Sequence, residues 1–130
     1  MPVRYLNSPI MKWPDAKMVD SAVRKWASAA ANDRDDITQI GYFGSYARGD
    51  WGVGSDLDLI VILRNSQLPF EKRTLGWDTS EIPVPVDLMV YTEGELNKEN
   101  SFIQTALNEA VWVYKCSEIE IKRHKACGNP

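Results

Sequence analysis

The sequence predicts a mixed α/β (α+β) fold in a single domain, with a sheet of about four strands flanked by helices. The chain has 130 residues, a length typical of one compact domain, and 44% of them are hydrophobic, which suffices for one core. Helical and strand-like patterns alternate in the order α-β-α-β-α-β-α-β. No internal repeat, low-complexity segment or linker interrupts residues 1–130.

The first helix is predicted over residues 15–31. Asp15 follows Pro14 and can cap the helix, since aspartate accepts hydrogen bonds from the first backbone N–H groups. Apolar residues recur at helical spacing through this segment, at Met18, Ala22, Trp26 and Ala30. A polar connection over residues 32–36 then leads into a short strand predicted over residues 37–43.

A glycine-rich stretch follows the first strand. Residues 45–49 read as the opening of a short helix that Gly49 ends, and residues 50–55 read as a loop. Residues 56–63, DLDLIVIL, carry the strongest strand pattern in the chain.

The second half of the chain continues the alternation. We predict a short helix over residues 70–77 and a third strand over residues 82–91, whose prolines fall in its first half. A helix over residues 93–109 and a final strand over residues 110–115 complete the pattern. Residues 117–130 are charged and read as a peripheral tail.

The overall charge and composition make some classes of protein less expected. The formal net charge is −3, so nucleic acid is an unexpected partner, because its binding usually needs a basic face. No apolar run reaches membrane-spanning length and no signal peptide is evident, so we expect a cytoplasmic protein. Cys116, Cys127 and His124 are too few and too loosely spaced for a zinc site, so we expect two reduced cysteines.

Two carboxylates stand at the start of the strongest predicted strand. Alternate residues of a strand share a face, so Asp56 and Asp58 point the same way. Two adjacent carboxylates repel each other unless a cation lies between them. Mg²⁺ is commonly held by one or two carboxylates plus substrate phosphates. Asp87 can join them if its strand pairs beside theirs, and three carboxylates could then hold two ions for phosphoryl-type chemistry.

The turn after the first strand has the character of an anion site. A strand that ends at Phe43, followed by Gly44, Ser45 and a helix start, presents backbone N–H groups to a phosphate. Gly44 permits close approach, the Ser45 hydroxyl adds a donor, and Arg48 can neutralise charge. Ser55, at the end of the glycine-rich loop, is a further candidate nucleotide contact.

Simpler readings of these residues exist. Asp56 and Asp58 could be solvated acids at an exposed strand start, and Asp87 alone proves little. Arg48 is as readily a surface arginine as a phosphate ligand, and Trp51 as readily packs over its loop as it contacts a base or a partner.

Together these motifs resemble the signature of the nucleotidyltransferase superfamily, the fold of DNA polymerase β. The pattern is Gly-Ser, ten residues, then Asp-x-Asp, with a later third acid, and Gly44, Ser45, Asp56, Asp58 and Asp87 fill it. The chain's small size resembles the minimal nucleotidyltransferases, called MNT proteins, which pair with HEPN-domain toxins as antitoxins.

The resemblance implies a mechanism and a partner. Asp56, Asp58 and Asp87 would bind two Mg²⁺ ions, with Asp87 also helping to deprotonate an acceptor hydroxyl, and Gly44 and Ser45 would hold the triphosphate. AMP from ATP would pass to a hydroxyl of a HEPN partner, a tyrosine in the antitoxin branch, with release of pyrophosphate. A small-molecule acceptor such as an aminoglycoside, or a non-catalytic antitoxin acting by contact, is the alternative. Nucleotide preference, acceptor identity and oligomeric state stay open, and self-association is compatible with this reading.

Overall fold

The structure is a computed structural model that describes residues 14–97 and 101–116. Its helices are α2 (Ala16–Asp33), α3 (Ser45–Arg48) and α4 (Ser101–Glu109), with two 3₁₀ turns, η2 (Phe70–Lys72) and η3 (Glu93–Asn97). Its strands are β1 (Ile37–Phe43), β2 (Leu57–Leu63), β3 (Val86–Thr92) and β4 (Val111–Lys115). The predicted tail over residues 117–130 lies outside the described residues.

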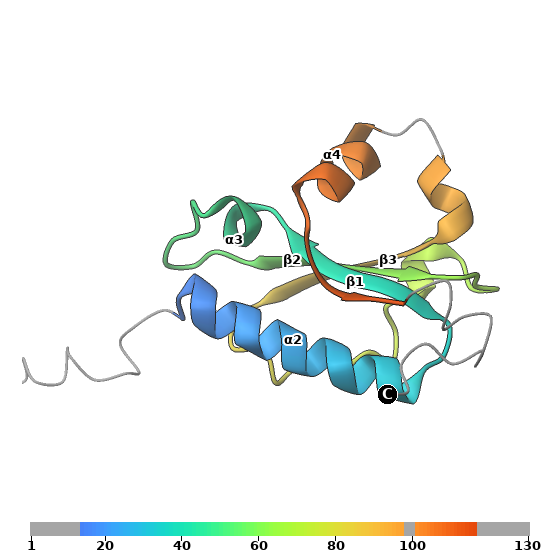
Figure 1. Ribbon diagram of the computed structural model, residues 1–130, viewed down its shortest axis with the longest axis horizontal. Coiled ribbons are helices and arrows are strands. Elements are labelled where there is room, and N and C mark those ends of the chain that lie inside the picture. Colours follow the sequence, from blue (N-terminus) through green and yellow to red (C-terminus); the bar gives the residue numbers. More distant parts are fainter. Residues whose placement is uncertain (1–13, 98–100, 117–130) are drawn as a thin grey trace, which may run out of the picture.

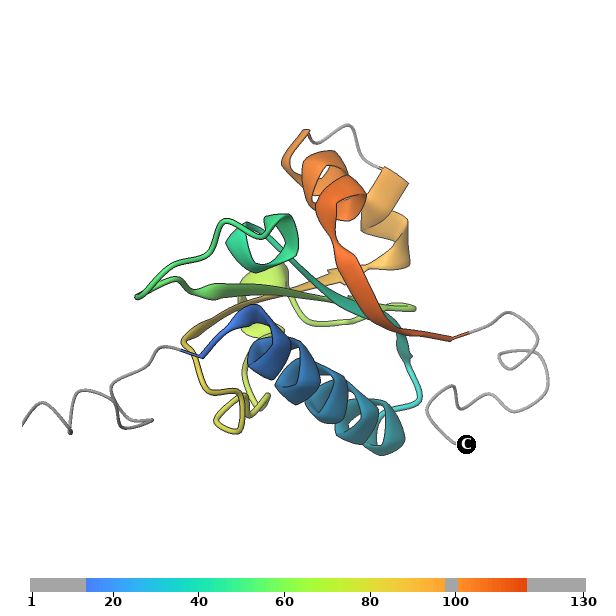
Figure 2. The same ribbon diagram turned by 60° about the vertical axis from the view of Figure 1, so that its left-hand side comes forward.

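The four strands form one mixed sheet in the order β3-β2-β1-β4. β1 is antiparallel to both of its neighbours, whereas β2 and β3 run parallel. Helix α2 lies on one side of this sheet and α4 on the other (Figures 1 and 2). This arrangement confirms the predicted mixed α/β fold and places β2, with its N-terminal acids, inside the sheet.

Helix α2 forms where the apolar spacing predicts it. The Asp15 side chain caps it by accepting a hydrogen bond of 2.9 Å from the backbone N–H of Met18. The helix continues to Asp33, slightly past the predicted end, where the backbone N–H of Arg34 still bonds to a helical carbonyl. Its buried stripe consists of Val19, Val23, Trp26, Ala27 and Ala31.

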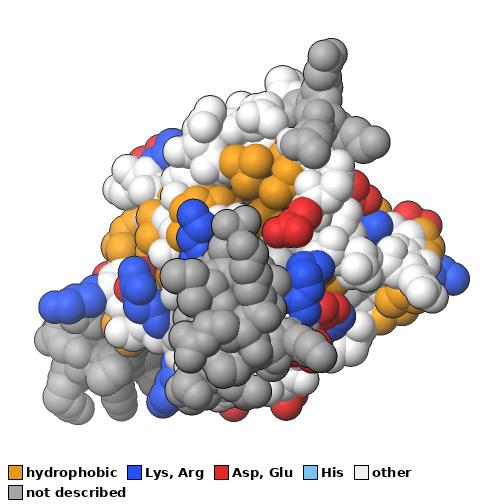
Figure 3. Space-filling model, turned by 45° about the vertical axis from the view of Figure 1, so that its right-hand side comes forward, with side chains coloured by type: hydrophobic (Ala, Val, Ile, Leu, Met, Phe, Trp, Pro, Cys, Tyr) orange, Lys and Arg blue, Asp and Glu red, His pale blue; other side chains and the backbone are white. Residues whose placement is uncertain are grey.

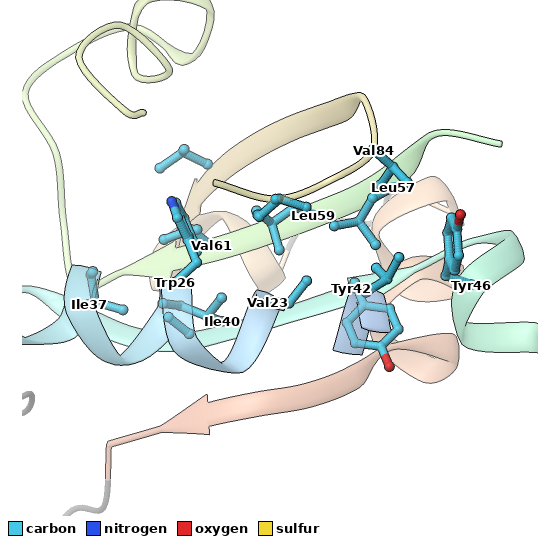
Figure 4. Close-up of a cluster of buried hydrophobic side chains, with 14 of the residues drawn as sticks. Val23, Trp26, Ile37, Ile40, Tyr42, Tyr46, Leu57, Leu59, Val61 and Val84 are labelled. Carbon is cyan, nitrogen blue, oxygen red and sulfur yellow. The ribbon is translucent and has the colours of Figure 1, made fainter. Parts of the chain in front are cut away.

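The main core lies between α2 and the sheet. Figure 4 shows side chains of α2, β1 and β2 packed together there, among them Val23, Ile40 and Leu59. Because side chains alternate along a strand, Leu57, Leu59, Val61 and Leu63 of β2 all join this core. Ile60 joins a smaller cluster on the α4 side instead. The same alternation therefore directs Asp58 toward the α4 side of the sheet.

Three predicted elements differ from the observed ones. β3 begins only at Val86, because the prolines before it lack the N–H that a strand ladder needs. The helix predicted over residues 70–77 is only the 3₁₀ turn η2. The helix predicted over residues 93–109 is also wrong as one element, since it opens as the 3₁₀ turn η3 and α4 starts at Ser101.

At η3, side-chain bonds hold the backbone. The Glu95 carboxylate accepts hydrogen bonds from the Thr92 backbone N–H at 2.9 Å and from the Arg73 guanidinium at 2.7 and 3.0 Å. These contacts tie the start of the predicted helix back to the end of β3. Sequence periodicity does not predict such a tertiary contact, because periodicity is a local pattern.

The remaining expectations concern cysteine chemistry and the surface. Cys116 is disulfide-bonded, so the expectation of a reduced thiol is wrong for this residue, because spacing alone does not decide between thiol and disulfide. Cys127 lies outside the described residues.

Within residues 14–97 and 101–116, no helix has the length and apolar character needed to cross a membrane. Basic and acidic side chains are interspersed over the described part of the face in Figure 3.

Candidate active site

The turn between β1 and α3 is built on glycine. Gly44 has φ 81° and ψ −153°, a backbone conformation open essentially to glycine alone. Its carbonyl accepts hydrogen bonds from the backbone N–H groups of Ala47 and Arg48 at 3.0 and 2.9 Å, which start α3. Gly49, in the left-handed region with φ 88°, ends that helix, as the sequence predicts.

Gly44 also leaves room for a carboxylate. A Cβ atom built on Gly44 would lie 2.1 Å from Oδ2 of Asp58, far inside any contact distance. This approach follows from the sheet register, in which Phe43 of β1 pairs with Asp58 of β2. The glycine turn and the strand that carries Asp58 are therefore in direct contact.

The register of the sheet brings two of the predicted acids together. Asp58 of β2 is the Cα partner of Asp87 in the parallel strand β3. Paired residues of adjacent strands point to the same face about 4.8 Å apart, so the two side chains are neighbours. The sequence made this pairing a condition for Asp87 to join the site, and the sheet meets that condition. Asp56 is exposed and lies just before β2 begins.

The electrostatics of Asp58 reflect this crowding. Burial raises its pKa above the ordinary value, and the nearby negative charges of Asp87, Asp56 and Glu109 raise it further. Arg48 acts in the opposite direction but does not compensate. An acid in this setting is stabilised by an added cation, because the cation relieves both the burial of charge and the repulsion.

Gly44, Asp56 and Asp58 border a hollow of about 440 Å³ on the α4 side of the sheet. Its lining combines the glycine turn, the start of β2 and one face of α4, through Phe43, Gly44, Ser45, Arg48, Asp56, Asp58, Phe102, Thr105, Ala106 and Glu109. Five of the predicted site residues are thus brought to one place. Asp87 and Ser55 are not part of the lining. Ser55 instead closes its own loop, where its hydroxyl accepts a 2.8 Å hydrogen bond from the Gly52 N–H.

Glu109 is the residue that the sequence motif did not reveal. Its Oε2 accepts a 2.5 Å hydrogen bond from the backbone N–H of Gly44, and Arg48 Nη1 lies 3.2 Å from the same oxygen. Arg48 also binds Asp50 at 3.1 Å and remains half exposed. One signal was available, since a glutamate in the last turn of a helix opposes the helix dipole and suggests a tertiary partner. Its contacts show that the Gly44 turn does bind an anion.

The chemistry of the donor set fits a divalent cation held partly by substrate. Within the part of the chain that the structure describes, no group of three or more His, Cys, Asp or Glu side chains is placed to hold a metal by itself. The Asp58–Asp87 pair nevertheless supplies two carboxylates, and Mg²⁺ commonly takes one or two of these, completing its shell with phosphate oxygens and water.

The fold and this site define a class of protein, and comparisons with known proteins agree. Residues 24–113 match the family model of the nucleotidyltransferase domain, so the chain belongs to that family. Its mixed sheet and helices are those of the polymerase β-like nucleotidyltransferase fold. This confirms the family resemblance that the Gly-Ser and Asp-x-Asp motifs indicate.

Two solved structures share the fold. One is a protein from Sulfolobus solfataricus provisionally described as a nucleotidyltransferase, with a TM-score of 0.58 and 21% identity, covering 80% of this chain and 90% of its own. The other is a toxin–antitoxin structure with AMP-PNP, with a TM-score of 0.53 and 16% identity, covering 79% of this chain and 77% of its own. No curated protein matches the chain.

Proposed function

We propose that this chain transfers a nucleoside monophosphate, AMP from ATP, to a hydroxyl group of a partner protein and so acts as an MNT-type antitoxin. The observation that carries the proposal is the pairing of Asp58 with Asp87 beside the anion-binding turn at Gly44. A carboxylate pair for a cation, and beside it a backbone N–H for phosphate, are the two halves of a nucleotidyl-transfer site.

In this proposal each residue has a stated task. Gly44 and Ser45 hold the triphosphate through backbone and hydroxyl donors, and Arg48 offsets its charge. Asp56 and Asp58, with Asp87 and the substrate phosphates, would hold up to two Mg²⁺ ions. When bound, these ions would stabilise charge on the attacking and leaving oxygens. Asp87, which is exposed, also helps to take the proton from the acceptor hydroxyl.

The proposed reaction needs no reagent besides the nucleoside triphosphate and the acceptor hydroxyl. The acceptor oxygen forms a bond to the α-phosphorus, and the bond from that phosphorus to the bridging oxygen of the β-phosphate breaks. Pyrophosphate leaves, and the hydroxyl proton passes to Asp87 or to water. The site contributes mainly position and charge stabilisation, as is general for phosphoryl chemistry.

A partner protein is favoured as acceptor by two considerations. The similarity to a toxin–antitoxin structure with AMP-PNP, which shares the fold, supports an antitoxin context. Asp87 pairs with Asp58 and is exposed, which leaves the acceptor side accessible to a large molecule. A HEPN-domain toxin with an acceptor tyrosine is the partner we propose, on the family resemblance.

The test uses α-labelled ATP and Mg²⁺ with purified protein in lysate from its own source. Wild type is compared with the Asp56→Asn, Asp58→Asn double variant and with Asp33→Asn, Asp35→Asn, which makes the same charge change at exposed positions. Label on a protein band with wild type and the control, but not with the site variant, supports the proposal. Label on a small molecule indicates the other acceptor class. No site-dependent transfer with any nucleotide overturns the proposal in favour of an antitoxin that acts by contact.

A further inference from the structure

The Glu109 carboxylate contacts the very groups that the proposed function assigns to the triphosphate. Oε2 accepts the 2.5 Å hydrogen bond from Gly44 N–H, and Arg48 Nη1 donates to Oε1 and Oε2 at 3.3 and 3.2 Å. The Glu109 side chain is only 20% exposed, and it lines the same hollow as Asp58. The Glu109 carboxylate therefore occupies the anion site of its own chain.

A triphosphate and Glu109 cannot share this position. Each backbone N–H makes one good hydrogen bond, so Gly44 serves either the carboxylate or a phosphate oxygen. A triphosphate would also add several negative charges beside the carboxylates of Glu109 and Asp58, which line the same hollow. Binding therefore requires Glu109 to leave Gly44.

We propose that Glu109 is an internal competitor of the triphosphate, occupying the Gly44 turn in the nucleotide-free chain and lowering its affinity for nucleotide. This inference rests on the proposed function. Two other roles make the opposite prediction for a Glu109 variant. If Glu109 held a metal ion, or if it positioned Arg48 for the phosphates, its removal would weaken nucleotide binding.

The experiment measures binding of ATP with Mg²⁺, and of inorganic tripolyphosphate with Mg²⁺, by titration calorimetry on the full chain. Glu109→Gln removes the charge and keeps an acceptor for Gly44, whereas Glu109→Ala removes both. We expect both variants to bind both ligands more tightly, by about 5-fold or more, because a charge-assisted hydrogen bond no longer has to be broken. Glu93→Gln is the matched control, since this exposed residue follows the opposite end of β3 from Asp87.

The outcomes separate this inference from the proposed function. Wild type that binds both ligands, with variants that bind equally or more weakly, overturns the competitor role alone. Wild type and variants that bind neither ligand overturn both proposals. Thermal unfolding of each variant shows whether it is folded, and the two substitutions at Glu109 differ enough in size for one to serve if the other does not fold.

A second inference, also resting on the proposed function, concerns the α4 wall of the hollow. Phe102 is 49% exposed, packs edge-to-face on Phe43 with ring centroids 5.8 Å apart, and lines the hollow together with Thr105. Gly44 and Arg48, which also line the hollow, offer a backbone N–H and a positive charge. We infer that the nucleobase stacks on Phe102 while the phosphates lie at the Gly44 turn, because this matches the apolar and charged ends of a nucleotide.

The same calorimetry tests Phe102. Phe102→Ala should weaken ATP binding about 10-fold, a usual loss for a base–aromatic stack, and leave tripolyphosphate binding unchanged. Phe102→Tyr should keep ATP binding, and Leu68→Ala, an exposed apolar residue outside the hollow, is the control. Equal losses for both ligands, or no loss for ATP, overturn this inference.

Discussion

Gly44 and Asp58 lie so close that a methyl group on the glycine would stand 2.1 Å from Oδ2 of the aspartate. The two residues belong to adjoining elements, since Gly44 follows β1 and Asp58 pairs with the last residue of that strand. The family motif has glycine at position 44. The Asp58 carboxylate therefore occupies the space that a side chain at this position would need.

Gly44→Ala should accordingly destabilise the fold and displace Asp58. The φ of 81° and the clash both oppose a side chain, so we expect a loss of about 2 kcal/mol or more in the free energy of unfolding. Gly52→Ala is the matched control, because a Cβ there meets no atom within 4 Å, and it should change stability by less than about 0.5 kcal/mol. Urea denaturation measures both. Similar, small effects for the two variants would contradict the argument.

Asp58→Asn should stabilise the nucleotide-free, metal-free protein while abolishing transfer. The substitution removes a charge that burial and the neighbouring acids disfavour, as the raised pKa of Asp58 indicates. We expect an increase in melting temperature of a few degrees without Mg²⁺. We also expect Mg²⁺ to stabilise the wild type more than the variant. Asp35→Asn, at an exposed position in the α2–β1 connection, should change neither quantity, and a fall in melting temperature for Asp58→Asn would contradict the prediction.

The Arg73–Glu95 pair should matter for stability without touching the site. Arg73 is 8% exposed, bonds to Glu95 through two nitrogens, and also donates to the backbone carbonyls of Leu68 and Val90. Arg73→Met should lower the free energy of unfolding by about 2 kcal/mol, less than for a fully buried pair because Glu95 is partly exposed. Denaturant unfolding measures the loss. A much smaller loss in Arg73→Met than in the exposed-pair variant Arg24→Met would be the contrary result.

Stability in acid should depend on Asp20. Burial disfavours its charge, but hydrogen bonds from Arg24 and Tyr42 outweigh that effect and lower the pKa of Asp20 below its ordinary value of 3.8. A carboxyl whose pKa is lower in the folded state stabilises the fold above its unfolded pKa. This stabilisation is lost as the pH falls through the folded pKa.

Asp20→Asn should therefore lower stability at neutral pH and give a flatter dependence of stability on pH below about pH 4. Denaturant midpoints measured from pH 7 down to pH 2 test this, with Asp33→Asn at the exposed end of α2 as control. Parallel pH profiles for wild type and Asp20→Asn would argue against the role assigned to these hydrogen bonds.

Local patterns in the sequence carry much of this fold. The apolar run of β2 and the capped stripe of α2 each lie where periodicity and Asp15 predict them, because these signals are local. The turn at Gly44 is likewise determined by neighbouring residues in the sequence.

What the sequence could not supply is non-local. The register of Asp58 against Asp87 depends on parallel pairing, which no short stretch encodes, and so the sequence could state it only as a condition. Glu109 reaches the Gly44 turn from a helix far along the chain, and Arg73 ties η3 to β3 in the same way. These are tertiary contacts, and they override local helical preference where the predicted helix over residues 93–109 fails.

The parallel pairing of β2 and β3 also bears on the order in which the parts of the site form during folding. β1 and β2 are consecutive antiparallel strands and can pair early, whereas β3 must return across the connection over residues 64–85. Non-local pairing of this kind closes a larger loop and forms later. The Gly44 turn would then be assembled before Asp87 arrives beside Asp58. Asp58 and Asp87 would therefore come together later in folding than the β1–β2 pair that carries the Gly44 turn.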